Sequence, residues 1–307
     1  MSILIVQDLI KKYNNHVALS NLTFQVERGE IFGIIGPDGA GKSTLFNILA
    51  TLILPSSGEI RILDKDILKD YKKIRKEIGY LPGTFSLYPD LTVQENLSFF
   101  STMYGVGIKE NLPMIMPIWR QISPFKDREA GKLSGGMKQK LALCCALIHR
   151  PKILLLDEPT TGVDPVSRKE FWDLLDQIKE YDVTVLVSTP YMDEVTRCNR
   201  IALMQEGRFI TNDTPQNIVS LFKGELYALK TPHLFQLLEL MPNFKGENSF
   251  YPYGEFLHIA FYQDIESEKN NFLHFLEESR IVYENFRQID PLIEDCFIEL
   301  IKEDRNV

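Results

Sequence analysis

Cysteine is scarce in this chain, and long apolar runs are missing. The four cysteines, Cys144, Cys145, Cys198 and Cys296, show no CxxC spacing, as expected of small apolar residues in a reducing compartment. The longest clear apolar run, Leu141–Ile148, is far shorter than the roughly 18 residues that a membrane span needs. The opening MSILIV has neither a basic segment nor a long apolar stretch, so no secretory signal is expected. Disulfide-stapled and membrane-spanning classes are therefore excluded.

Positive charge is also limited, which argues against nucleic acid as a partner. Lys and Arg number 34 against 42 Asp and Glu, a net charge of −8. Residues 221–307 carry 8 of the basic and 16 of the acidic residues, so the whole excess lies there. A length of 307 residues suggests two domains at about 150 residues each. The shift in composition predicts a boundary near residue 220.

Short apolar runs alternate with helical patterns over residues 1–220, which predicts an α/β architecture. Strands are expected at 3–7, 22–27, 31–35, 59–63, 77–81, 153–156, 184–188 and 201–204. Helices are expected at 43–52, 92–104, 135–149 and 166–180. Residues 107–131 are weakly patterned, and their three prolines, Pro113, Pro117 and Pro124, are expected to limit helix length.

The last part of the chain predicts a different arrangement, a small α+β domain at 221–307. Strands are expected at 225–230, 247–251, 256–262 and 281–287, and helices at 232–241, 266–279 and 291–302. This βαββαβ order with a terminal helix indicates a ferredoxin-like module.

A glycine-rich loop follows the apolar run 31–35 and precedes a helical pattern. The octapeptide GPDGAGKS fits GxxxxGK[ST], in which backbone N–H groups cradle phosphates. Lys42 adds a charge at the β- and γ-phosphates, and the Ser43 hydroxyl is a ligand for Mg²⁺. The predicted nucleotide-binding residues are Gly36, Pro37, Asp38, Gly39, Ala40, Gly41, Lys42, Ser43 and Thr44.

Two carboxylates end the buried strand 153–156, a place where α/β proteins put ligand chemistry. Asp157 is predicted to hold Mg²⁺, and Glu158 to orient and deprotonate the attacking water. A second phosphate-facing helix start is predicted where a serine and two glycines precede an apolar helix. Its residues are Leu133, Ser134, Gly135, Gly136 and Met137.

The order of these motifs resembles the nucleotide-binding subunits of ABC transporters. GPDGAGKST is similar to Walker A, LSGGMKQK to the ABC signature, and ILLLDEPTTGVDP to Walker B with a D-loop containing Asp164. Tyr13 in KKYNNHVAL matches the aromatic residue that stacks on adenine. The resemblance spans about residues 3–220 and is specific, because five motifs occur in the right order.

The subclass resembles ABC-2-type exporters of drugs or polysaccharides, and in particular the first ATPase half of bacterial exporters that fuse two ATPase modules. The stretches AGKLSGGMKQKL and PLIEDCFIEL both carry that likeness. The resemblance implies an ATPase domain over 1–220 with a helical subdomain at about 84–150. It also implies ATP and Mg²⁺ as cofactors, an integral-membrane permease as partner, and a cytoplasmic location on the inner face of the membrane.

Two positions depart from the family pattern. Gly83 in GYLPG stands where the family has a glutamine that contacts Mg²⁺ or water. Pro190 in STPYMDE stands where the family has a histidine that reaches the γ-phosphate, and proline has neither a side-chain donor nor a backbone N–H. Since phosphoryl transfer depends on positioning and charge, hydrolysis is expected to be slow.

These departures bear on the expected assembly. ABC ATPases pair head to tail, and each site takes its signature from the other chain. A chain with an intact signature and missing sensors favours a heterodimer with a second ABC ATPase over a homodimer. The alternatives are a regulatory ATP-binding protein without a permease, a soluble ABC protein of translation or repair, and a P-loop kinase. The kinase alternative leaves LSGGMKQ unexplained.

Overall fold

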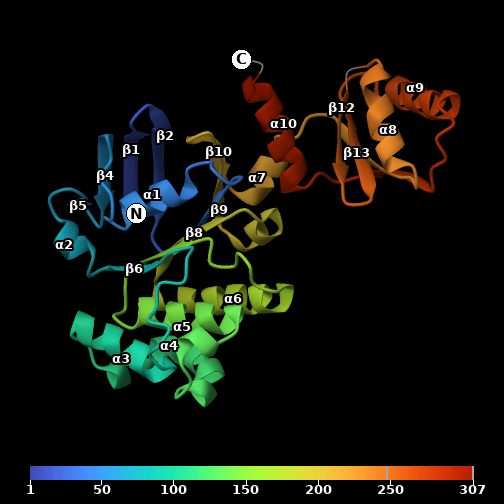
Figure 1. The fold of residues 1–307 in the computed structure, drawn as a ribbon. Coiled ribbons are helices and arrows are strands. Elements are labelled where there is room, and N and C mark those ends of the chain that lie inside the picture. Colours follow the sequence, from blue (N-terminus) through green and yellow to red (C-terminus); the bar gives the residue numbers. More distant parts are fainter. Residues whose placement is uncertain (247, 306–307) are drawn as a thin grey trace. The chain divides into compact units, whose positions relative to one another are not determined.

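The chain divides into two compact units, Met1–Pro215 and Gln216–Val307. A computed structural model describes residues 1–246 and 248–305 (Figure 1). The expected boundary near residue 220 lies a few residues inside the second unit. Among the described residues, no helix is both long enough and apolar enough to cross a membrane.

Unit 1 contains an antiparallel sheet with the strand order β2-β1-β4-β5. Its strands are β1 (Ser2–Tyr13), β2 (His16–Glu27), β4 (Ser57–Ile62) and β5 (Lys65–Asp66). A two-residue turn joins β1 to β2, and Asn14 has the positive φ of 50° that such turns require. The turn places Tyr13 directly opposite His16.

A second sheet has the order β10-β9-β3-β8-β7-β6 and is parallel except at β10. Its strands are β3 (Ile31–Ile35), β6 (Ile78–Leu81), β7 (Ile153–Asp157), β8 (Thr184–Thr189), β9 (Arg200–Gln205) and β10 (Arg208–Asp213). β3, β7 and β8 are buried along their whole length, as their continuous apolar sequences indicate. Strand β10 and the short strand β5 were not predicted from the sequence.

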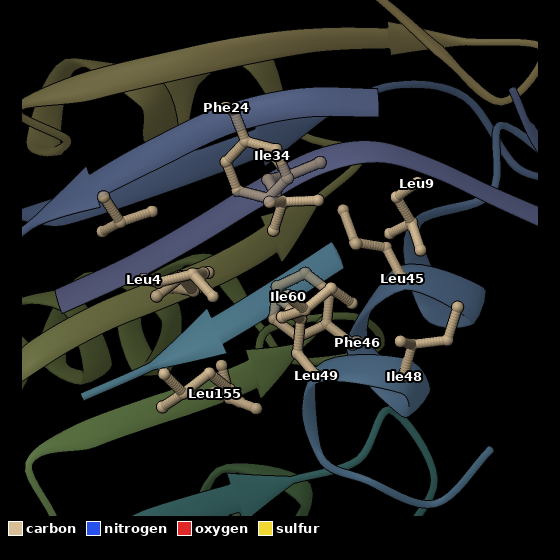
Figure 2. Close-up of a cluster of buried hydrophobic side chains, with 14 of the residues drawn as sticks. Leu4, Leu9, Phe24, Ile34, Leu45, Phe46, Ile48, Leu49, Ile60 and Leu155 are labelled. Atoms are coloured by element: carbon tan, nitrogen blue, oxygen red, sulfur yellow. The ribbon is translucent and has the colours of Figure 1, made fainter. Parts of the chain in front are cut away.

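The same unit contains helices α1 (Lys42–Leu49), α2 (Tyr71–Ile74) and α6 (Pro165–Ile178). The cluster in Figure 2 packs Phe46 and Leu49 of α1 against Leu4 of β1, Ile60 of β4 and Leu155 of β7. Buried apolar side chains thus join the antiparallel sheet to the parallel one through α1. Helices α3 (Val93–Tyr104), α4 (Ile108–Ile122) and α5 (Gly135–Leu147) gather on one side of unit 1 (Figure 1).

Helix α4 corrects the expectation that Pro113 and Pro117 would limit helix length within 107–131, although the helix does end two residues before Pro124. It continues for 15 residues through Pro113 and Pro117 and buries Met114, Ile115 and Ile118. Pro117 cannot donate to the carbonyl oxygen of Pro113, four residues earlier. The Tyr181 hydroxyl donates to that oxygen instead, at 3.1 Å. Packing and a side-chain donor therefore replace the lost helical bond.

Unit 2 has the sheet order β12-β13-β11-β14, with every neighbouring pair antiparallel. Its elements are α7 (Pro215–Val219), β11 (Glu225–Lys230), α8 (Leu234–Leu240), β12 (Asn248–Tyr253), β13 (Phe256–Phe261), α9 (Ile265–Glu278), β14 (Asn285–Ile289) and α10 (Ile293–Arg305). This order and direction confirm the ferredoxin-like prediction. β14 begins four residues later than expected, and residue 247, the expected start of β12, lies outside the described residues.

Short 3₁₀ helices connect several of these elements. They are η1 (Ser123–Phe125), η2 (Ala130–Lys132), η3 (Lys179–Tyr181), η4 (Met192–Arg197) and η5 (Met241–Asn243).

All four cysteines are buried free thiols, as expected of small apolar residues. Burial raises the pKa of Cys296 to about 12. Burial also raises the pKa values of the Cys144, Cys145 and Cys198 thiols above their usual range. Within the described chain these thiols are therefore protonated at neutral pH.

Candidate nucleotide-binding site

The predicted motifs meet at one edge of the parallel sheet because their strands end level with each other. Ile35 of β3 is paired with Thr189 of β8, and Asp157 of β7 with Ser188 of β8. Leu81 of β6 reaches the same level beside β7. The loops that follow these strands therefore leave the sheet together, which is where open α/β sheets bind ligands.

The loop after β3 turns sharply into α1. Gly39 and Gly41 have φ values of 81° and 106°, in the left-handed region that favours glycine. Within the described residues, no side chain caps the start of α1 and no acidic residue lies in its first turn. The N–H groups and the positive end of the helix dipole are therefore available to an anion.

Lys42 is buried at the start of α1, with only 3% of its surface exposed. Its ammonium group donates to the carbonyl oxygens of Gly36 at 2.7 Å and Pro37 at 3.0 Å. It also lies 3.1 Å from Glu158 Oε1. The structure thus joins the predicted phosphate-binding lysine and the predicted general base in one ion pair.

A cavity of about 370 Å³ opens beside these groups. Tyr13 lies at this cavity and is 44% exposed, a suitable state for a residue predicted to stack on a base. The sequence reading missed His16 and Ala18, although the hairpin register, which faces His16 toward Tyr13, is a usable signal. The lining residues are Tyr13, His16, Ala18, Asp38, Gly39, Gly41, Lys42, Ser43, Thr44 and Glu158.

Asp157 lies under the loop and contacts two hydroxyl groups. Ser188 donates to Asp157 Oδ1 at 2.7 Å, and Ser43 also bonds to the carboxylate. Burial raises the pKa of Asp157, and the hydrogen bonds from Ser188 and Ser43 oppose that rise. A carboxylate beside a serine hydroxyl is a set of oxygen donors that fits Mg²⁺. The sequence reading missed Ser188, whose role is visible only in the strand register.

Glu158 follows with an unusual backbone. Its φ is 48°, in the left-handed region, which is uncommon for a residue other than glycine. Its N–H donates to Ser188 Oγ at 2.9 Å, and its carboxylate accepts a hydrogen bond from Thr161 at 3.2 Å. The side chain is held at the cavity by Lys42 and Thr161 together.

The two departures lie at the same edge. A Cβ added to Gly83 would be 3.2 Å from the carbonyl oxygen of Asp157 and 3.9 Å from its Oδ2. Pro190 directly follows Thr189, the last residue of β8. Gly83 is therefore adjacent to Asp157, the predicted metal ligand, and Pro190 lies two residues after Ser188, which bonds to the same carboxylate.

The signature-like segment lies elsewhere in unit 1. Ser134 caps α5 by accepting from Met137 N at 3.4 Å, and a Cβ at Gly136 would contact Ser167 of α6. Asp164 caps α6 by accepting from Ser167 N at 3.0 Å. Among the described residues, the cavity lining includes none from 133–137. Ser134 and Gly135 are exposed, so a second chain can reach this helix start.

Comparison with protein families and curated proteins gives a consistent result. The family model described as "ABC transporter" matches residues 19–161. The "Probable multidrug ABC transporter ATP-binding protein YbhF" of Escherichia coli (strain K12) is 42% identical over 214 residues, 69% of this chain. The match spans only 37% of that relative's own length. The "Nod factor export ATP-binding protein I" of Burkholderia thailandensis is 35% identical over 216 residues, which are 69% of this chain and 71% of the relative.

Solved structures show the same likeness. CbiO1 from Clostridium perfringens, described as part of an ABC transporter complex, matches 71% of this chain and 91% of its own with a TM-score of 0.64 at 31% identity. MJ0796, described as a dimeric bacterial ABC transporter cassette, matches 69% of this chain and 98% of its own, with a TM-score of 0.63 at 28% identity. The predicted α/β fold of an ABC-type P-loop ATPase is confirmed, and the chain belongs to the ABC transporter family of ATP-binding proteins.

Proposed function

We propose that the chain is the ATP-binding subunit of an ABC-2-type exporter, binding Mg-ATP at the cavity beside Lys42 and hydrolysing it slowly. The observation that carries this proposal is the convergence of the phosphate loop, Asp157 and Glu158 at one sheet edge, in a chain of the ABC family. The names of the two relatives, a multidrug protein and an export protein, support transport over the regulatory alternative.

Each group has a separate role in this proposal. The loop N–H groups and Lys42 bind the phosphates, which requires Lys42 to exchange part of its contact with Glu158 for phosphate oxygens. Ser43 and Asp157 hold Mg²⁺, which supplies charge stabilisation at the phosphates when bound. Glu158 orients the attacking water and accepts its proton. Tyr13 stacks on the adenine.

Slow hydrolysis follows from Gly83 and Pro190, which offer no side-chain contact to metal, water or γ-phosphate. The intact start of α5, with Ser134 exposed, then acts on nucleotide held by a second chain. We favour a partner ATPase that has both sensors, which makes the assembly an asymmetric pair. Asp164 lies at the start of α6, where a D-loop would face that partner.

The permease is proposed to dock on unit 1 near α3. Phe85, Tyr88, Phe99 and Met103 are all more than 40% exposed, and the rings of Tyr88 and Phe99 contact each other. Apolar side chains gathered on a surface are typical of a protein interface. Docking there would place the chain on the inner face of the membrane. Unit 2 is proposed as an accessory domain for dimer contact or regulation.

The nucleotide assignment is tested with Lys42→Ala. Removing the ammonium group should weaken Mg-ATP binding at least about tenfold in calorimetry, since a charged hydrogen bond to phosphate contributes about 1.5–3 kcal/mol. Lys138→Ala is the matched control, because Lys138 lies on α5 outside the cavity lining. Equal ATP affinity for Lys42→Ala and the unmodified chain would refute the assignment.

The hydrolysis assignment is tested with Glu158→Gln, which keeps the shape of the side chain and removes its basicity. We expect unchanged or tighter ATP binding and a hydrolysis rate at least about 10²-fold lower under single-turnover conditions.

The asymmetric pair is tested with a second substitution. Ser134→Arg should abolish turnover in a mixture of this chain with an ABC ATPase that has both sensors. Rapid hydrolysis by the chain alone would contradict the proposed asymmetry.

A further inference from the structure

The backbone at Glu158 needs an external restraint. Its φ of 48° is disfavoured for a residue with a Cβ, and such conformations persist where the surroundings fix them. On the preceding side, Ser188 bonds both to Asp157 and to the Glu158 N–H. On the following side, Pro159 restricts the chain but donates no hydrogen bond. The restraints there are the Thr161 N–H, which donates to the Glu158 carbonyl oxygen at 3.2 Å, and the side chain of Thr160.

Thr160 is 1% exposed, and its hydroxyl donates to Glu194 Oε2 at 3.1 Å. Thr189, the residue directly before Pro190, donates to the same oxygen at 2.7 Å. Glu194 is itself only 4% exposed. One buried carboxylate oxygen therefore joins the segment after Glu158 to the end of β8, two segments that are far apart in the sequence.

The other oxygen of Glu194 faces a cation. Arg168 Nε lies 3.3 Å from Glu194 Oε1, and the same guanidinium group pairs with Asp193 at 2.5 Å. It also lies over the ring of Tyr191, 4.1 Å from the ring centroid. Arg168 is on α6, four residues after Asp164. The ion pair offsets the cost of burying a carboxylate and extends the network to the D-loop helix.

We propose that Glu194 is a positioning residue for hydrolysis: it holds Glu158 in its left-handed conformation through Thr160 and fixes the backbone at Pro190 through Thr189. The proposal rests on the proposed ATP hydrolysis. With no histidine side chain at position 190, Pro190 itself offers only its backbone to the site. Glu194 sets where that backbone lies relative to Glu158.

The test removes one hydroxyl at a time. Thr160→Val and Thr189→Val keep the side-chain volume and delete one donor each, so they are less disruptive than Glu194→Ala. We expect single-turnover hydrolysis of Mg-ATP to fall about tenfold in Thr160→Val, the loss expected of one hydrogen bond. The dissociation constant for ATP in calorimetry should stay within about twofold. Thr160→Ser, which restores the hydroxyl, should recover most of the rate.

Thr196→Val is the matched control. Thr196 is exposed on the same 3₁₀ helix as Glu194, and its hydroxyl donates to the Asp193 carbonyl oxygen at 3.5 Å. It should hydrolyse ATP at the unmodified rate. A merely structural role for Thr160 would instead weaken ATP binding and hydrolysis together, and that outcome overturns the proposal.

A second readout does not depend on hydrolysis. Amide hydrogen exchange of segment 158–164 should be at least about tenfold faster in Thr160→Val and Glu194→Ala, with exchange in α1 unchanged. If the unmodified chain fails to hydrolyse ATP, the hydrolysis assignment fails, and exchange alone decides the positioning role. Unchanged exchange in both variants overturns the proposal.

Discussion

At the scale of single residues, the candidate site combines the residues of the phosphate-loop and carboxylate motifs with two positions, Gly83 and Pro190, that depart from the family pattern. Gly83 is adjacent to the Asp157 carbonyl. Glycine has no side chain, so position 83 cannot supply the side-chain amide of a glutamine there. Pro190 lies beside Thr189, whose hydroxyl is already committed to Glu194. Restoring a glutamine at 83 and a histidine at 190 therefore requires both the correct side-chain groups and enough room for the added atoms.

The double substitution Gly83→Gln with Pro190→His should raise the steady-state ATPase rate of the chain alone at least about tenfold, since one positioned donor contributes about 10²–10³ in rate. The added Cβ at 83 would be 3.2 Å from the Asp157 carbonyl oxygen, so the backbone must yield by a few tenths of an ångström. Gly83→Ala measures that cost separately and should leave ATP affinity unchanged. A double variant that folds, binds ATP and remains as slow as the original would show that other groups limit hydrolysis.

His149 gives a prediction about pH. Its Nε2 lies 3.0 Å from the Ile78 carbonyl oxygen, and its ring stacks on Tyr104 with centroids 3.7 Å apart. Burial lowers the pKa of His149 from 6.5 to about 4. The unfolded chain then binds a proton below pH 6.5 that the folded chain does not, so stability falls as the pH drops toward 4.

At pH 5 this linkage costs about 2 kcal/mol relative to pH 7.5. In urea unfolding monitored between these two pH values, His149→Gln should lose about that much less stability than the unmodified chain. Equal pH dependence in both proteins would show that folding leaves the pKa of His149 unshifted.

The sequence allowed most residues that line the candidate cavity to be predicted, because phosphate loops and strand-terminal carboxylates carry their chemistry in short local patterns. Ser188 and Glu194 could not be predicted in this way, because each acts through a partner that is distant along the chain. His16 was missed although its partner Tyr13 is only three residues away, because its place at the cavity depends on the hairpin register. The left-handed backbone at Glu158 could not be predicted either, since no residue type near it is typical of that conformation.

At the scale of elements, α4 shows where local rules failed. Proline disfavours helix interiors, yet the buried face formed by Met114, Ile115, Ile118 and Ile122 outweighs that preference. The edge strand β10 was missed because only one of its faces packs, so its sequence lacks the continuous apolar run of β3. Buried strands were predicted better because their patterns are simpler.

The replacement bond on α4 can be measured with a double-mutant cycle. Tyr181→Phe removes the donor to the Pro113 carbonyl and should destabilise the chain by up to about 1 kcal/mol in urea unfolding. With Pro117→Ala in place, the new backbone N–H can bond to the same carbonyl. Tyr181→Phe should then have little effect. Additive effects of the two substitutions would contradict this account of the helix.

At the scale of the whole molecule, the division into two units predicts where the chain can be cut. Ile218 of α7 is fully buried, and the carbonyl oxygen of Val219 accepts a hydrogen bond from the Cys296 thiol at 3.8 Å in the same unit. A chain ending at residue 215 should therefore be soluble and should bind ATP with the affinity of the full chain in calorimetry. A chain ending at residue 220 keeps α7 without its partners and should be less soluble. Loss of ATP binding in the shorter chain would show that unit 2 contributes to the site.

The buried thiols make the protein a convenient host for spectroscopic labels. All four are shielded and protonated, so a maleimide probe should react with the folded chain only slowly. A cysteine introduced by Lys132→Cys, at an exposed position just before the signature-like segment, would be a single reactive handle beside the start of α5 that leaves Ser134 in place. A fluorophore attached there, whose emission is quenched when Mg-ATP and a partner ATPase are added, would report closure of the pair without removal of any native cysteine.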